Sequence, residues 1–114
     1  MRCLVDAGPD GLWSWRLVSP NGRVVARSGG GYEDHVRCRD AFVDLCAEHA
    51  GMTGGIQHTA DGNGWVWLLR DREGRPAAVS GRAYERYSTC RTAYERFLLM
   101  VAKDGVVWRS TSLL

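Results

Sequence analysis

Residues 13–18 read Trp-Ser-Trp-Arg-Leu-Val, and residues 65–70 read Trp-Val-Trp-Leu-Leu-Arg. In each stretch every second residue is large and apolar, namely two Trp and one Leu. Successive side chains of a β-strand point to opposite faces, so this alternation is typical of a strand with one buried face. The two stretches therefore predict two equivalent strands that bury the same three side chains.

The similarity continues on the C-terminal side of these strands. Residues 13–50 align without a gap with residues 65–102, a shift of 52 positions, and 14 of the 38 pairs are identical. Beyond the strands, the identical pairs include Gly22/Gly74, Ala26/Ala78, Ser28/Ser80, Gly29/Gly81, Tyr32/Tyr84 and Cys38/Cys90. A match that keeps one register over this length indicates an internal duplication. We expect repeat one at about residues 1–50 and repeat two at about residues 55–102.

Each repeat continues with a turn and a second strand. Asn21-Gly22 is a strong hairpin signal and predicts a type I′ turn, which needs positive φ at both central residues. Gly74, preceded by Glu, is its weaker counterpart in repeat two. We expect short strands after these turns, at residues 23–28 and 75–80, so that each repeat contains a hairpin.

A helix follows the hairpin in each repeat. Apolar residues recur with helical spacing over residues 38–49 and 90–101, so one face of each helix should pack against the sheet. We expect Tyr32 and Tyr84, just before the helices, to anchor the connection between strand and helix through their hydroxyl groups.

Three further segments complete the expected sheet. Residues 3–5 and residues 55–60 precede the two hairpins and read as strands. The tail, residues 106–109, reads as a last strand at about residues 105–111, which must close the sheet within the chain or pair with another subunit. The expected fold class is α+β: a tandem duplication of a β-β-β-α unit, in which two helices cover an antiparallel sheet in two layers, plus the C-terminal strand.

Length and composition restrict the class of protein. The chain has 114 residues, of which 45% are hydrophobic and 25% charged, so we expect one globular domain. The net charge of +2 is too balanced to predict nucleic-acid binding by itself. No apolar run approaches the ~20 residues that span a bilayer, and residues 1–7 lack the pattern of a secretory signal. We therefore expect a cytoplasmic protein that does not interact with membranes.

The four cysteines do not form a recognisable metal or redox motif. Cys3, Cys38, Cys46 and Cys90 include no C-x-x-C pair, so buried free thiols are the expectation. Cys38, Cys46 and His49 share one helical stripe, but the stripe is ~16 Å long, too long for one ion to bind all three.

The serines do not predict an enzyme either. Nucleophilic catalysis requires a Ser or Cys with a base nearby. Ser28 and Ser80 occupy matched positions, but neither repeat has a His at a corresponding place. We expect no catalytic residue, no metal and no cofactor.

The order of these motifs resembles a known family. W-x-W-x-L, then N-G-R-x-x-A-x-S, then G-Y-E before a helix, is similar to the YegP-like family of uncharacterised proteins, the DUF1508 or UPF0339 group. The residues that match this pattern in repeat one are Asn21, Gly22, Ala26, Ser28 and Tyr32. Repeat two has Glu73 in place of the Asn, and both helices lack the Gly-Ile-x-x-Val core of the family, which makes the chain a divergent member. The resemblance implies tandem β3α units in two layers, often as a dimer, and no established enzyme activity.

Tryptophan dominates the aromatic residues, with five in the chain. Four of them stand at alternating strand positions, which is the spacing of side chains that fill the space between sheet and helix. The fifth, Trp108, lies outside the repeated strands and is the candidate for an exposed or interface ring.

The outer faces of the two central strands differ. Ser14 and Arg16 of repeat one become Val66 and Leu68 in repeat two, so the tail or a partner subunit should cover repeat two. We therefore expect a non-enzymatic interaction module, most simply a homodimer. The candidate interface residues are Val66, Leu68, Val106, Val107, Trp108 and Arg109. The alternative is a binder of a small ligand or of single-stranded nucleic acid through exposed Trp and Arg side chains.

Overall fold

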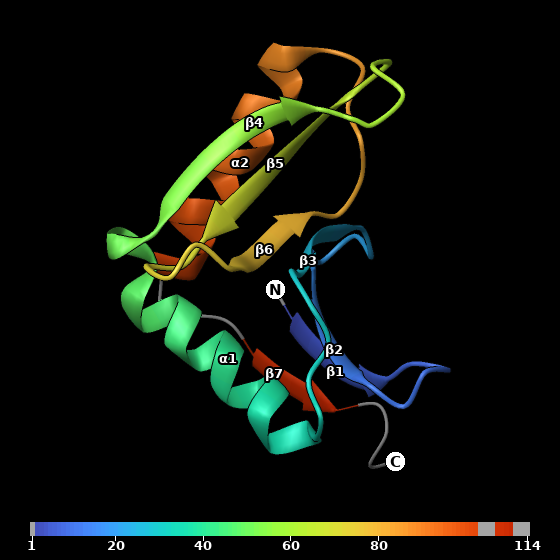
Figure 1. Ribbon diagram of the computed structural model, residues 1–114, viewed down its shortest axis with the longest axis vertical. Coiled ribbons are helices and arrows are strands. Elements are labelled where there is room, and N and C mark those ends of the chain that lie inside the picture. Colours follow the sequence, from blue (N-terminus) through green and yellow to red (C-terminus); the bar gives the residue numbers. More distant parts are fainter. Residues whose placement is uncertain (1, 103–106, 111–114) are drawn as a thin grey trace.

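The computed structural model describes residues 2–102 and, as backbone only, residues 107–110 (Figure 1). The first half of the chain contains β1 (Arg2–Ala7), β2 (Trp13–Val18), β3 (Val24–Ser28) and α1 (His35–Glu48). After a short 3-10 helix, η1 (His49–Gly51), the second half contains β4 (Thr53–His58), β5 (Trp65–Arg70), β6 (Pro76–Ser80) and α2 (Tyr87–Ala102), and β7 (Val107–Ser110) follows. Each half thus has the predicted order of three strands and one helix.

The strands form one sheet in the order β4-β5-β6-β3-β2-β1-β7, with β4 and β7 at its opposite ends (Figure 1). Strands β1 to β6 pair antiparallel, which confirms the predicted α+β class with an antiparallel sheet and two helices. The tail strand pairs within the chain: β7 runs parallel to β1, with Val107 beside Arg2 and Ser110 beside Val5.

The two halves meet where β3 pairs with β6. Arg27 of β3 lies opposite Val79 of β6, and the shift of 52 residues matches these same two positions. On either side of this pair, Ala26 lies opposite Ser80 and Ser28 lies opposite Ala78. The register therefore reads the same from either half, as it does across the two-fold axis of a dimer.

Two glycines at matched positions allow this seam to form. A Cβ on Gly29 would overlap the backbone carbonyl of Pro76, and a Cβ on Gly81 would overlap that of Val24. Backbone atoms cannot swing aside as the end of a flexible side chain can. Each half therefore needs a residue without a side chain at this point.

One hydrophobic cluster lies between the sheet and both helices. Trp15 of β2 packs edge-on against Phe42 of α1, with ring centroids 4.9 Å apart, and Trp67 of β5 stacks on Phe97 of α2 at 4.6 Å. All four side chains are at most 1% exposed. The prediction that the strand tryptophans fill the core is thus confirmed for Trp15 and Trp67.

The outer tryptophan of each strand is only half-buried. Trp13 packs edge-on against His35, and Trp65 packs edge-on against Tyr87 at 5.2 Å. His58 of β4 also lies over the Trp65 ring, at 3.7 Å between centroids. The exposed parts of the Trp13 and Trp65 rings are therefore limited by contacts with neighbouring aromatic side chains.

The predicted type I′ geometry of the hairpin turn is wrong. Gly22 has a φ of 84°, but no residue other than glycine has positive φ among those described. The Gly22 amide donates to the carbonyl of Ser19 at 2.9 Å, so the turn spans Ser19 to Gly22 and places Pro20 second. Proline favours that position because its φ is fixed near −65°. Gly74 closes the matching turn of the second half in the same way, with its amide 3.0 Å from the carbonyl of Asp71.

The predicted role of the Tyr32 and Tyr84 hydroxyl groups is also wrong. Both residues join the sheet through their backbones instead. Tyr32 exchanges two hydrogen bonds with Trp13, at 2.7 and 2.8 Å, and Tyr84 does the same with Trp65. Neither hydroxyl makes a hydrogen bond within the described residues, so the backbone fixes each connection from strand to helix.

Candidate functional site

The candidate site is the sheet face turned away from the helix-packed core, which we call the open face. In β2 and β5 the core side chains alternate with those of the open face. In the first half the open face carries Ser14, Arg16 and Arg27. At the matched positions the second half carries Val66, Leu68 and Val79. The two halves therefore present a polar, basic surface and an apolar surface on one continuous sheet.

Two arginines lie directly opposite each other on the first half. Arg16 of β2 pairs in register with Arg27 of β3. The Arg16 guanidinium donates to both carboxylate oxygens of Asp6, at 2.8 and 3.3 Å. Arg27 is exposed and makes no ion pair within the described residues. Like charges in this arrangement destabilise a strand pair, and Asp6 compensates only one of them.

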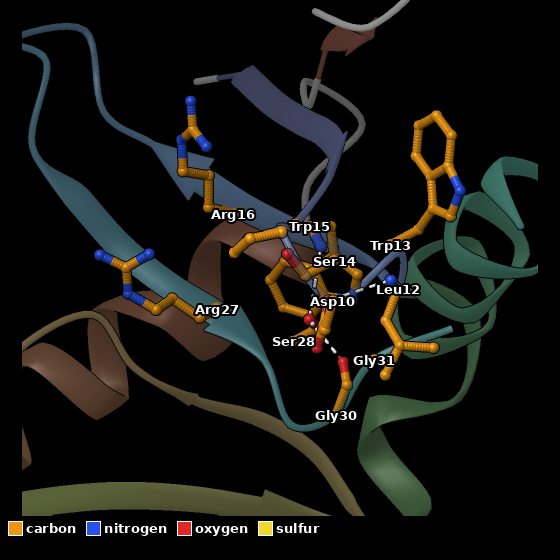
Figure 2. A pocket seen from close by; sticks show the side chains of 12 residues that line it. Asp10, Leu12, Trp13, Ser14, Trp15, Arg16, Arg27, Ser28, Gly30 and Gly31 are labelled. Carbon is orange, nitrogen blue, oxygen red and sulfur yellow. Dashed lines mark hydrogen bonds between the residues drawn. The ribbon is translucent and has the colours of Figure 1, made fainter. Parts of the chain in front are cut away.

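A pocket of about 450 Å³ lies beside these arginines, between the β1–β2 loop, β2 and the end of β3 (Figure 2). Figure 2 shows both guanidinium groups extending on the side away from Leu12. Leu12, which is 42% exposed, supplies an apolar wall. The Ser28 hydroxyl accepts from the Trp15 amide at 3.3 Å and donates to the Gly30 carbonyl at 2.9 Å, which ties the glycine segment to β2.

The second half has a smaller groove at the end of the sheet. Gly55 of β4 lies beside Leu68 of β5, and a groove of about 180 Å³ opens there. Thr53, Gln57 and Arg70 also line it. Because Gly55 has no side chain, the residue opposite Leu68 in β4 does not cover the Leu68 side chain, and the groove remains open beside it.

The two edges of the sheet are treated differently. β7 covers β1, whereas no strand among residues 2–102 and 107–110 pairs with the outer side of β4. The β4 sequence, Thr-Gly-Gly-Ile-Gln-His, contains no Pro, Lys, Arg, Asp or Glu. These are the residues that proteins commonly use to prevent an edge strand from pairing with another chain.

Of the predicted interface residues, the structure places Val66 and Leu68 on the open face of the second half, where both are half-buried. The tail does not cover them, because four strands separate β5 from β7. That alternative for the tail is wrong, and the reason is that β1 offers a free edge to which β7 pairs. Val106 lies outside the described residues, as do the side chains of Val107, Trp108 and Arg109.

Sequence reasoning missed Arg27, Val79 and Gly55 as members of the open face. The signal was present in the alignment of the repeats, where Arg27 and Val79 differ within otherwise similar strands. What the alignment lacks is the register, which places Arg27 opposite Arg16 and Val79 opposite Leu68.

The cysteines are free thiols, as predicted: Cys3, Cys38 and Cys90 are buried and Cys46 is half-buried. Burial, and to a smaller extent the Asp6 carboxylate, raise the pKa of Cys38 to about 11. Burial alone raises the pKa of Cys90. Among the described residues no three His, Cys, Asp or Glu side chains form a cluster that could hold a metal ion. No helix in the same part of the chain has the length and apolar character needed to cross a membrane.

Comparison with known proteins identifies the fold. No protein-family model and no curated protein matches the sequence. The solution structure of YegP from E. coli, a protein of unknown function, superposes with a TM-score of 0.72 at 11% identity, covering 96% of this chain and 92% of that one. The UPF0339 protein SO3888 from Shewanella oneidensis gives 0.74 at 9% identity, covering 95% and 90%. The resemblance to the YegP-like family is thus confirmed at the level of the fold.

Proposed function

We propose that this protein is a non-enzymatic interaction module that forms a homodimer through the outer edge of β4 and the adjoining open face of the second half. The observation that carries the proposal is the contrast between the two sheet edges. β1 is covered by β7, whereas the six-residue β4 has no strand outside it among the described residues and no charged side chain.

Pairing with a second copy satisfies the chemistry of this edge. An uncovered strand presents unpaired N–H and C=O groups that template another strand. Two β4 strands related by a two-fold axis pair antiparallel, so each copy supplies the same surface to the other and the assembly closes as a dimer. The groove beside Gly55 gives room for a partner side chain next to Leu68.

The proposal also accounts for the apolar character of the second half. Val66 and Leu68 occupy positions where the first half carries Ser14 and Arg16. We infer that the halves arose by duplication of one unit and diverged on the open face afterwards. Apolar side chains were retained where a partner removes them from water.

Sedimentation velocity of the purified chain over a wide range of concentration tests this proposal. The wild-type protein should sediment as a dimer. Gln57→Lys adds a charge to the β4 edge, and Leu68→Arg adds one beside it, so each variant should sediment as a monomer. Arg16→Leu, the reverse change at the matched position of the first half, is the control and should remain dimeric. A monomeric wild-type protein at every concentration overturns the proposal.

A further inference from the structure

The first half carries charged and polar groups that the fold does not need. Ser14, Arg16 and Arg27 occupy sites where the second half forms the same strands with Val66, Leu68 and Val79. The second half therefore serves as an internal control. Because directly opposed arginines destabilise the strand pair, their presence points to a role outside folding.

Several hydrogen-bond donors of the pocket are unused within the described residues. Arg27 offers a planar guanidinium with five N–H donors and no ion partner within the described residues. The amides of Gly30 and Gly31 donate no hydrogen bond within the same residues. The exposed Ser14 hydroxyl makes none either.

Two carboxylates belong to the strand and loop beside the pocket, and each accepts a hydrogen bond from a group other than Arg27. Asp6 accepts from the Arg16 guanidinium at 2.8 Å. Asp10 accepts from the Leu12 amide at 3.0 Å, which holds the β1–β2 loop at the rim of the pocket. Arg27 is therefore the basic group of the pocket whose charge no described carboxylate balances.

We propose that this pocket binds a small organic anion, whose carboxylate or phosphate group is held by Arg27 with help from Arg16. The guanidinium fork matches the two oxygens of such groups. The apolar part of the ligand lies against Leu12, on the side of the pocket away from the arginines (Figure 2). The volume of about 450 Å³ is within the range of small-molecule sites.

Titration of the 15N-labelled full chain, followed by two-dimensional NMR, tests this proposal with three probes. Phenyl phosphate and benzoate represent the two anion chemistries, and benzyl alcohol is the neutral control. We expect saturable shifts of the Gly30 and Gly31 amides with at least one anion and none with benzyl alcohol. The tighter of the two anions identifies the group that the pocket selects.

Matched variants locate the anion. Arg27→Gln should weaken binding at least about tenfold, because it removes a charged hydrogen-bonding partner. Arg23→Gln removes the same charge just outside β3 and should change affinity less than about twofold. Arg27→Val, which copies the second half, should bind no better than Arg27→Gln, and the spectra report directly that each variant is folded. The proposal is overturned if neither anion gives saturable shifts, if benzyl alcohol binds as well, or if Arg23→Gln weakens binding as much as Arg27→Gln.

Discussion

The two halves of this chain share a core and differ on the opposite face of the same strands. Trp15 and Trp67 lie in equivalent places under their helices, and both are almost fully buried. The next residue along each strand lies on the open face, and it is Arg16 in the first half and Leu68 in the second. Core packing restricts which side chains can fill the core. The packing between sheet and helices places no such restriction on side chains of the open face. The difference teaches that the two halves conserve the strand side chains of the core and vary those of the open face.

Even within the core, the two halves use different helix residues to pack against the buried tryptophan. Phe42 of α1 packs on Trp15, but its matched residue in α2 is Tyr94, and the ring that stacks on Trp67 belongs to Phe97. The main aromatic partner has therefore moved by about one helical turn between the halves.

Truncation of these aromatic partners should have the largest effect on the free energy of unfolding. Phe42→Ala and Phe97→Ala should each reduce the free energy of unfolding by about 3 to 5 kcal/mol, because each leaves a cavity beside a buried indole. Tyr94→Ala should cost about half as much, since Tyr94 is half-buried and Phe97 keeps its contact with Trp67. Urea unfolding measures all three. Equal losses for Phe97→Ala and Tyr94→Ala would contradict the shift of one turn.

The seam between the halves gives the next largest effect. Gly29→Ala and Gly81→Ala should each destabilise the protein by about 3 kcal/mol, because each Cβ meets a backbone carbonyl of the other half. Gly30→Ala, next to the seam but with open space around its Cα, is the control and should change stability by less than about 1 kcal/mol. A large loss for one seam glycine and none for the other would show that the register is not symmetric in solution.

Introducing the ion pair of Asp6 and Arg16 at the matched positions of the second half tests whether the two halves place these positions in the same way. Leu68→Arg alone should cost up to about 1 kcal/mol of stability, since the new charge has no carboxylate beside it. Gln57 of β4 stands across from Val66 as Asp6 stands across from Ser14, so adding Gln57→Asp recreates the pair of Asp6 and Arg16. The double variant should recover about 0.5 kcal/mol. A double-mutant cycle by urea unfolding measures this coupling, and a coupling of zero would mean that the halves place these positions differently.

Thiol titration offers the smallest and finest test. Cys38 and Cys90 are matched and equally buried, but the Asp6 carboxylate adds to burial only at Cys38. Cys38 should therefore deprotonate at higher pH than Cys90. Its folded pKa of about 11 lies above the ordinary value of 9.0, so the stability that it contributes is complete below pH 9 and is lost as the pH rises toward 11. Alkylation at increasing pH, followed by peptide mass spectrometry, ranks the two thiols. Earlier alkylation of Cys38 would refute the contribution of Asp6.

Much of the fold could be predicted because its signals are periodic and local. The alternation in residues 13–18 predicted β2 with its observed bounds, Trp13–Val18. The stripe at residues 90–101 lies within α2, and the stripe at residues 38–49 lies within α1 except for His49, which begins η1. β4 was expected at residues 55–60 and begins at Thr53 instead. Gly54 precedes the expected strand, but Tyr94 packs against Gly54 and makes glycine suitable inside β4. That contact joins residues far apart in the sequence, so no local pattern contains it.

The candidate site was less predictable, because it depends on which strands are neighbours. The contrast of Arg16 with Leu68 is visible in the sequence, but the partner of Arg16 is set by a register that shifts at Leu17/Val18. Similarly, the sequence of the tail predicts a strand but does not predict which edge of the sheet this strand joins. Parallel pairing with β1 depends on the whole fold being in place.

That pairing has a consequence for how the chain is made. Translation proceeds from the N-terminus, so β1 leaves the ribosome before the other strands and β7 after all of them, yet the two are neighbours in the sheet. Throughout synthesis, β1 therefore has an unprotected outer side, and the nascent chain reaches its complete sheet only after Ser110 has emerged. Because the closing contact is the most distant one in sequence, it should also be the slowest step of folding. Until β7 pairs, the nascent protein exposes two edges that no described strand covers, β1 and β4, and this is the interval in which these edges most need protection from aggregation.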